Sequence, residues 1–210
     1  MRLLGKKNSK NKPEAEQGID DEATVVDLLE SLSKGPENRS IMLVGDVNEE
    51  KSADLISALL VLSQDKPADQ ERAEDIKLYI STYGGSAHEM FGVYDVMNFC
   101  KEFCDIQTIG IGKIMSAGTL LLAAGTKGKR LLGKNCQVMI HSVNGGSIGE
   151  LHNLENEMEQ IKNLQDMYIQ SLSSETSMTK RQIQRLINRK VNVYLSSKEA
   201  IEKGLADEVL

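Results

Sequence analysis

Short apolar runs alternate along this chain with longer segments in which apolar residues recur every three or four positions. The short runs are rich in β-branched residues and predict buried strands at 41–44, 76–81, 106–111 and 137–140. The longer segments predict helices at 51–63, from the turn at 83–86 to about residue 100, and at 117–124. A strand–helix succession of this kind predicts an α/β fold with a largely parallel sheet.

One long segment in the second half of the chain differs from these units. It begins with a glycine-rich connection at Asn144–Gly149 and continues as an expected helix from Glu150 to Ser173. Apolar residues form only a narrow stripe along this helix, and its other faces are strongly polar. We therefore expect the segment at about 142–174 to project and to pack against another copy of the chain. The alternative is a helix that lies on its own domain.

The N-terminal region has little to bury. Residues 1–20 are polar and predict a mobile tail, and residues 21–34 predict a short amphipathic helix that Gly35-Pro36 ends. We therefore expect a tail and short helix at 1–38, followed by a single domain at 39–210.

The C-terminal region carries two pairs of residues with the spacing of capping boxes. Thr179 with Gln182, and Ser196 with Glu199, predict the starts of two short helices. A short strand is expected around Val209-Leu210.

Composition narrows the classes of function. A net charge of −6 argues against general nucleic-acid binding, and the longest apolar runs are too short to span a membrane. The N-terminus lacks the apolar segment of a secretory signal, so the cytoplasm is the expected location. The three cysteines lie in apolar segments, which suits buried thiols in a reducing compartment, and their spacing completes no zinc set. We expect no metal and no cofactor.

The first candidate for chemistry is Ser116, a single hydroxyl between a β-branched strand and a helix-forming run. A serine at such a turn has an exposed oxygen with a helix N-terminus behind it, and the amide of Ala117 points toward the same space. Ser116 is therefore a candidate nucleophile, with the Ala117 amide stabilising an oxyanion. The alternative is that Ser116 only caps the helix.

Two further positions suit this chemistry. His141 follows the expected strand 137–140, at the edge of a parallel sheet where enzymes place reactive groups, and is a candidate general base. Gly84-Gly85 follows another strand, and a backbone amide there is a candidate second oxyanion donor. The patterns GxxxxGK(S/T) and GxGxxG are both absent, which argues against a phosphate-binding loop.

Longer motifs carry a family resemblance. They are Ile80–Ser86 (ISTYGGS), Gly112–Gly118 (GKIMSAG), Ala123–Arg130 (AAGTKGKR), Met139–His141 (MIH) and Leu195–Val209 (LSSKEAIEKGLADEV). They follow in the order seen in ClpP, the proteolytic subunit of the ATP-dependent Clp protease. From about Arg39 to Leu210 the chain resembles this family.

The resemblance implies a ClpP/crotonase-type spiral of βαβ units with a projecting handle helix, and the activity of a serine peptidase. Ser116 matches the nucleophile and His141 the base, while Gly85 and Ala117 match the positions whose amides form the oxyanion hole. Family members stack as two heptameric rings and degrade unfolded proteins that AAA+ unfoldases deliver to them. The resemblance also implies that a substrate peptide lies as an added strand beside Gly145-Gly146.

The chain departs from the family pattern at the third member of the triad. Aligned back from Tyr194-Leu195, the acidic residue falls at Asn192, and Asn188 is an alternative if the gap is placed differently. No Asp or Glu lies between Glu175 and Glu199. The third member is therefore expected to be an amide, giving a Ser-His-Asn triad, and the alternative is that it is supplied elsewhere.

Other departures flank the site and the docking groove. Tyr83 replaces the usual Pro before the two glycines, and Ser142-Val143 replaces Gln-Pro after the histidine. Of two tyrosines that line the family's groove for the unfoldase, Tyr79 is kept and Lys77 replaces the other. Docking of an AAA+ unfoldase is therefore expected to be altered.

The sequence thus predicts a cytoplasmic, oligomeric serine endopeptidase of ClpP type. A second hypothesis is a weak or inactive ring subunit with a structural or regulatory role, which the missing acid favours and the pair Ser116 and His141 opposes. A third is a crotonase-type acyl-CoA enzyme, against which the serine–histidine pair argues.

Overall fold

The computed structural model describes residues 39–146, 148–189 and 191–210, so the tail and helix predicted at 1–38 lie outside the described residues. The described chain forms a seven-stranded sheet in which β1, β2, β3, β4 and β7 follow one another, β5 pairs with β3, and β6 pairs with β5. All pairings are parallel except β5 with β6. The predicted α/β fold with a largely parallel sheet is confirmed. The strands are β1 Ser40–Val44, β2 Ile76–Thr82, β3 Ile106–Met115, β4 Arg130–Leu132, β5 Gln137–Ile140, β6 Val193–Leu195 and β7 Glu208–Val209.

The helices begin and end close to the predicted boundaries. Both capping boxes are formed, with Thr179 and Gln182 starting α6 and Ser196 and Glu199 starting α7. The helices are α2 Glu49–Gln64, α3 Ala87–Cys100, α4 Ala117–Ala123, α5 Leu151–Glu175, α6 Lys180–Ile187 and α7 Ser197–Glu202.

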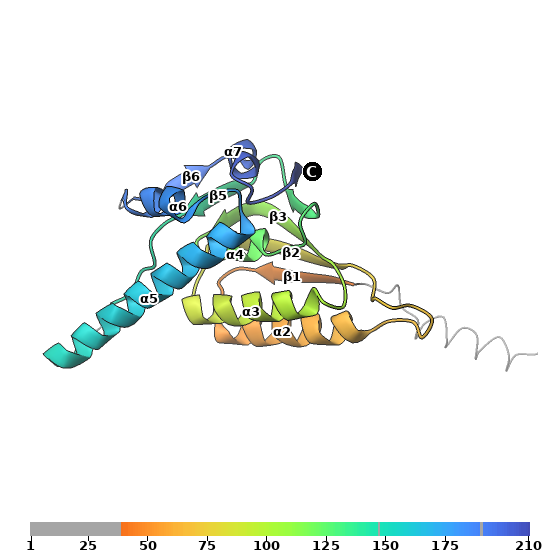
Figure 1. Cartoon of the computed structure of the whole chain (residues 1–210), viewed down its shortest axis with the longest axis horizontal. Coiled ribbons are helices and arrows are strands. Elements are labelled where there is room, and N and C mark those ends of the chain that lie inside the picture. Colours follow the sequence, from red (N-terminus) through yellow and green to blue (C-terminus); the bar gives the residue numbers. More distant parts are fainter. Residues whose placement is uncertain (1–38, 147, 190) are drawn as a thin grey trace, which may run out of the picture. The chain divides into compact units, whose positions relative to one another are not determined.

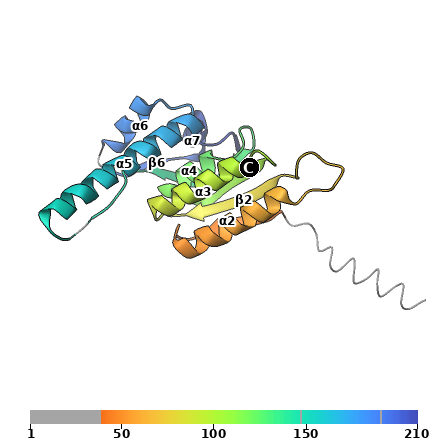
Figure 2. The ribbon, with the colours of Figure 1, turned by 60° about the horizontal axis from the view of Figure 1, so that its bottom comes forward.

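The core lies between the sheet and the helices that cover it. Along β2, buried residues alternate with more exposed ones, so that Leu78 and Ile80 face the core while Lys77 and Tyr79 face outward. Helices α2 and α3 lie side by side along the sheet (Figures 1 and 2). The cysteines are free and buried, as the apolar context predicts.

The sheet extends further than the apolar runs predict. Strand β3 continues through two glycines to Met115 instead of ending at Ile111, and its register against β2 shifts between Ile80 and Thr82. The predicted end at Ile111 was therefore wrong, because pairing with β5 at Lys113–Met115 keeps the glycine-rich stretch extended. Strands β4 and β6 were not predicted, since runs of three residues carry too little periodicity.

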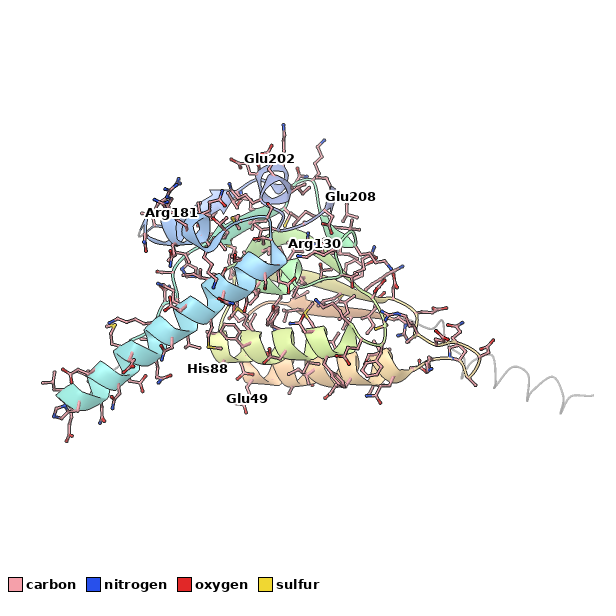
Figure 3. All side chains as sticks on the ribbon, in the orientation of Figure 1. Glu49, His88, Arg130, Arg181, Glu202 and Glu208 are labelled. Atoms are coloured by element: carbon pink, nitrogen blue, oxygen red, sulfur yellow. The ribbon has the colours of Figure 1, made fainter. Side chains whose placement is uncertain are left out.

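Helix α5 has two halves with different surroundings. Its C-terminal half buries Tyr168, Ile169 and Leu172 in the core. Its N-terminal half extends beyond the rest of the domain (Figures 1 and 2), and there Leu151 is 67% and Met158 53% exposed. Side chains of this half stand away from the domain in Figure 3. The predicted projection is therefore present in the N-terminal half, whereas the C-terminal half lies on its own domain.

A buried arginine holds the end of α5 in place. Arg130, labelled in Figure 3, forms two hydrogen bonds to the Asp207 carboxylate at 2.5 and 2.9 Å. It also donates to the carbonyls of Glu175 at 2.8 Å and Ala123 at 3.2 Å, which end α5 and α4. A cation at two helix C-termini is favourable because these carbonyls carry partial negative charge. The base of the projecting helix is thereby tied to the domain that carries Ser116.

No helix in the described part of the chain is both long enough and apolar enough to cross a bilayer. The same residues contain no cluster of three His, Cys, Asp or Glu side chains that could hold a metal ion.

Candidate active site

Ser116 occupies a strained turn between β3 and α4. Its backbone has φ 55° and ψ −120°, and among the described residues it is the one non-glycine residue with positive φ. Such a conformation costs about 1–3 kcal/mol and persists only where the surroundings hold it. Its amide donates to the carbonyl of Met139 at 2.9 Å, and Met115 pairs with Met139 in the sheet. The pairing of β3 with β5 therefore fixes the turn beside the end of β5.

The Ser116 hydroxyl contacts a histidine and does not cap the helix. Its Oγ lies 2.7 Å from Nε2 of His141, which follows β5 directly, and it makes no capping hydrogen bond to α4. The structure therefore does not show the capping hydrogen bond of the second alternative, and the role of Ser116 as a nucleophile stays a prediction. A serine oxygen at this distance from an imidazole nitrogen can pass its proton to that nitrogen as it attacks an electrophile.

His141 is half-buried, and its surroundings favour the neutral ring. Burial lowers the pKa of His141 below its ordinary value near 6.5, because the charged imidazolium loses solvation. No carboxylate among the described residues forms a hydrogen bond or ion pair with it. The ring is therefore mostly neutral at pH 7, as a general base must be.

Two backbone amides near Ser116 have no acceptor among the described residues. They belong to Gly85, whose neighbours Gly84 and Ser86 pair with Val47, and to Ala117, the first residue of α4. Both residues line the same cleft as Ser116. Free amides beside a nucleophile are suited to stabilise a negatively charged oxygen.

Both glycines are needed for close approach of the backbone. A Cβ on Gly84 would lie 2.5 Å from Cβ of Ser116, and one on Gly85 would lie 2.1 Å from the carbonyl oxygen of Val47. The φ angles, +104° and +155°, are also ones that other residues rarely adopt. The two glycines therefore let β2 end against the serine turn.

Two residues that the sequence did not single out hold the carbonyl of Ser116. The Thr119 hydroxyl donates to this carbonyl at 2.7 Å, and the Tyr168 hydroxyl lies 2.5 Å from Thr119 Oγ1 and 3.5 Å from the same carbonyl. Burial raises the pKa of Tyr168 to about 12, so it stays protonated. Tyr168 lies in the helix expected at 150–173, but its contact with Thr119 joins residues 49 positions apart and has no local signal in the sequence.

The serine and histidine open into a cleft of about 540 Å³. Gly145 and Gly146 form part of its wall, and Gly145 packs so closely on Ile161 of α5 that a Cβ would lie 2.5 Å from the Ile161 side chain. His88, labelled at the start of α3 in Figure 3, and Glu157 of α5 also line it. The cleft is therefore bounded on one side by the helix that projects.

Among the described residues, Asn192 and Asn188 form no hydrogen bond to the His141 ring. Val193 pairs with Ile140, so Asn192 stands one residue further along this register, at the level of His141. Both asparagines are exposed, and in the described part of the chain neither forms a hydrogen bond to His141. The atom nearest to Nδ1 of His141 by hydrogen-bond distance is instead Nδ2 of Asn144, at 3.4 Å. The role of Asn192 stays a prediction.

The residues that depart from the family pattern lie in different surroundings. Tyr83 is exposed and stacks under the Lys113 ammonium, 4.5 Å from the ring centre, while Ser142 and Val143 line the cleft. Lys77 lies on the outer face of the sheet.

A comparison with protein families matches residues 21–210 to the Clp protease family. The match covers most of the chain and includes every residue of the cleft described above. The chain therefore belongs to the Clp protease family.

Proposed function

From its membership of the Clp protease family, we propose that this chain is a serine endopeptidase that cleaves unfolded polypeptides. The observation that carries the proposal is the 2.7 Å contact between Ser116 Oγ and His141 Nε2 at a strained strand-to-helix turn. Family membership supports a peptidase, and this contact supports the serine mechanism.

In the proposed reaction, Ser116 Oγ attacks the peptide carbonyl while His141 Nε2 takes its proton. The amides of Gly85 and Ala117 donate to the carbonyl oxygen as it becomes negative. His141 then returns the proton to the leaving amine, and the resulting acyl-enzyme is hydrolysed by water that His141 activates in turn. Gly145 and Gly146 would hold the substrate as an added strand beside the cleft.

We further propose that the chain assembles with itself into stacked rings through the projecting half of α5. An exposed stripe with Leu151 and Met158 supports this, because apolar side chains on an isolated helix are commonly covered by a partner. Delivery of substrate by an AAA+ unfoldase and a cytoplasmic location are part of the same proposal. The exposed Lys77 on the outer sheet face supports an altered docking groove.

The alternative is a weak or inactive ring subunit with a structural or regulatory role. The observation that favours it is the lack of a carboxylate bonded to His141 among the described residues. Labelling by a serine-reactive fluorophosphonate separates the two functions, since an inactive subunit would react no faster than free serine.

The decisive test compares the parent chain with Ser116→Ala. We expect the fluorophosphonate to modify the parent at Ser116, and the variant to lose labelling and peptide cleavage while it assembles normally. Intact mass and peptide mapping locate the adduct, and light scattering controls for assembly. Equal labelling of the two proteins would refute the assignment of the nucleophile.

Assembly is tested by a charge on the projecting helix. Met158→Glu should split larger particles into smaller ones, because the carboxylate would be buried without a partner. The matched control is Glu159→Gln, at a neighbouring exposed position that already carries a polar side chain. Unchanged particle mass in Met158→Glu would show that this half of α5 is not an interface.

A further inference from the structure

The two ring nitrogens of His141 differ in their partners. Nε2 faces Ser116 Oγ at 2.7 Å, whereas Nδ1 has the side-chain amide of Asn144 at 3.4 Å. A third member of the site has to be a group that reaches Nδ1. Among the described residues, Asn144 makes such a contact and Asn192 does not, although both side chains are exposed.

The direction of the Asn144 amide decides which nitrogen of His141 carries the proton. For His141 to act as a base toward Ser116, Nε2 must be unprotonated and Nδ1 must carry the hydrogen. The Asn144 Nδ2 that faces Nδ1 is a donor and favours the opposite, unproductive tautomer. Rotation of the amide by about 180° brings Oδ1 to nearly the same place, where it accepts from Nδ1–H.

Other groups in the cleft do not take this role. Titratable side chains that line it come from the turn after β2, from α3 and from α5, and none of them bonds to His141 among the described residues. They are Tyr83, His88, Glu157 and Tyr168.

We propose that Asn144 is the positioning residue for His141, accepting its Nδ1–H through Oδ1 in the reactive state. This inference rests on the proposed serine peptidase function. It moves the third member from Asn192, just before β6, to the connection that leads from His141 into Gly145-Gly146. A substrate strand beside those glycines would then lie next to the residue that orients the base.

The direct test measures the pKa of the His141 ring by NMR in the full-length assembled protein. With three histidines in the chain, a His141→Gln variant assigns the signal. Asn144→Asp should raise the pKa of His141 by about one unit or more, because a carboxylate in contact stabilises the imidazolium. Asn192→Asp should shift it less, and Asn135→Ala, in an exposed turn, should not shift it.

The proposal is overturned if Asn144→Asp leaves the pKa unchanged, or if Asn192→Asp raises it equally or more. This measurement needs no enzymatic activity, so it remains decisive even if the parent chain fails to react with the fluorophosphonate. Failure of the proposed function and failure of this inference are thereby distinguished.

Kinetics supply a second readout. Asn144→Ala should lower kcat for peptide cleavage by about tenfold or more with little change in KM, because it disturbs the base and not substrate binding. Asn144→Asp should recover activity and move the acid limb of kcat/KM to higher pH. A rise in KM alone, or no recovery with Asp, would mean that Asn144 only shapes the loop.

Discussion

The two sides of the His141 ring are built in different ways. On the Nε2 side, the Ser116 turn is held by the Met139 carbonyl, by Thr119 with Tyr168, and by the close approach of Gly84. On the Nδ1 side, an exposed loop offers one amide at 3.4 Å.

The difference shows where the site is rigid and where it is adjustable. Strain at Ser116 persists because neighbours on every side resist its relaxation. The orientation of the Asn144 amide, by contrast, depends on a single exposed side chain. We therefore expect the nucleophile to be preorganised and the base to be the part that limits the rate.

The largest expected effect comes from disrupting the Ser116 turn, on the Nε2 side of His141. Gly84→Ala should lower peptidase activity by about a hundredfold or more and destabilise the fold by about 1–3 kcal/mol, since its Cβ would collide with Ser116. Steady-state kinetics and thermal denaturation measure the two effects.

The matched control for this variant is Gly128→Ala. Gly128 also has positive φ, +84°, but no atom lies within 4 Å of a Cβ built there. It should therefore carry the backbone penalty without the loss of activity. Equal losses of activity in both variants would mean that general destabilisation, and not the collision, is responsible.

A smaller effect should follow from removing one hydrogen bond that holds the Ser116 turn. Tyr168→Phe removes the hydroxyl near Thr119 and the Ser116 carbonyl, and should lower kcat by about threefold to tenfold while costing about 1 kcal/mol of stability. Tyr94→Phe is the control, because its hydroxyl donates to Glu175 at 3.0 Å, and neither residue lines the cleft. If both variants keep full activity, the Ser116 turn does not depend on this hydrogen bond.

The smallest expected effect concerns the Nδ1 side of His141 and is measured as the pH dependence of kcat/KM. The proposed mechanism requires neutral His141, so we expect kcat/KM to fall as pH drops through the pKa of this residue. Since burial lowers this pKa and no described carboxylate contacts the ring, the midpoint should lie below about 6.5. Light scattering across the same pH range controls for dissociation. A midpoint above 7 would reveal a negative charge next to His141 and contradict the uncharged Nδ1 side.

Local patterns in the sequence were sufficient for much of the fold. Alternating strand and helix periods predicted the parallel sheet, and the capping boxes of α6 and α7 marked helix starts correctly. The stretch around Ser116 and the strand before His141 marked both residues as candidates. These signals act over a few residues, because side-chain periodicity and capping are local properties of the backbone.

Tertiary structure decided how those candidates meet. The 2.7 Å contact of Ser116 with His141 spans 25 residues and depends on the register of β3 against β5. The contact of Thr119 with Tyr168 depends on where α5 crosses α4. No local pattern encodes a register or a crossing, because both result from packing of the whole core. For the same reason, no local pattern in the sequence marked the contact between Asn144 and the His141 ring, which depends on the path of the loop.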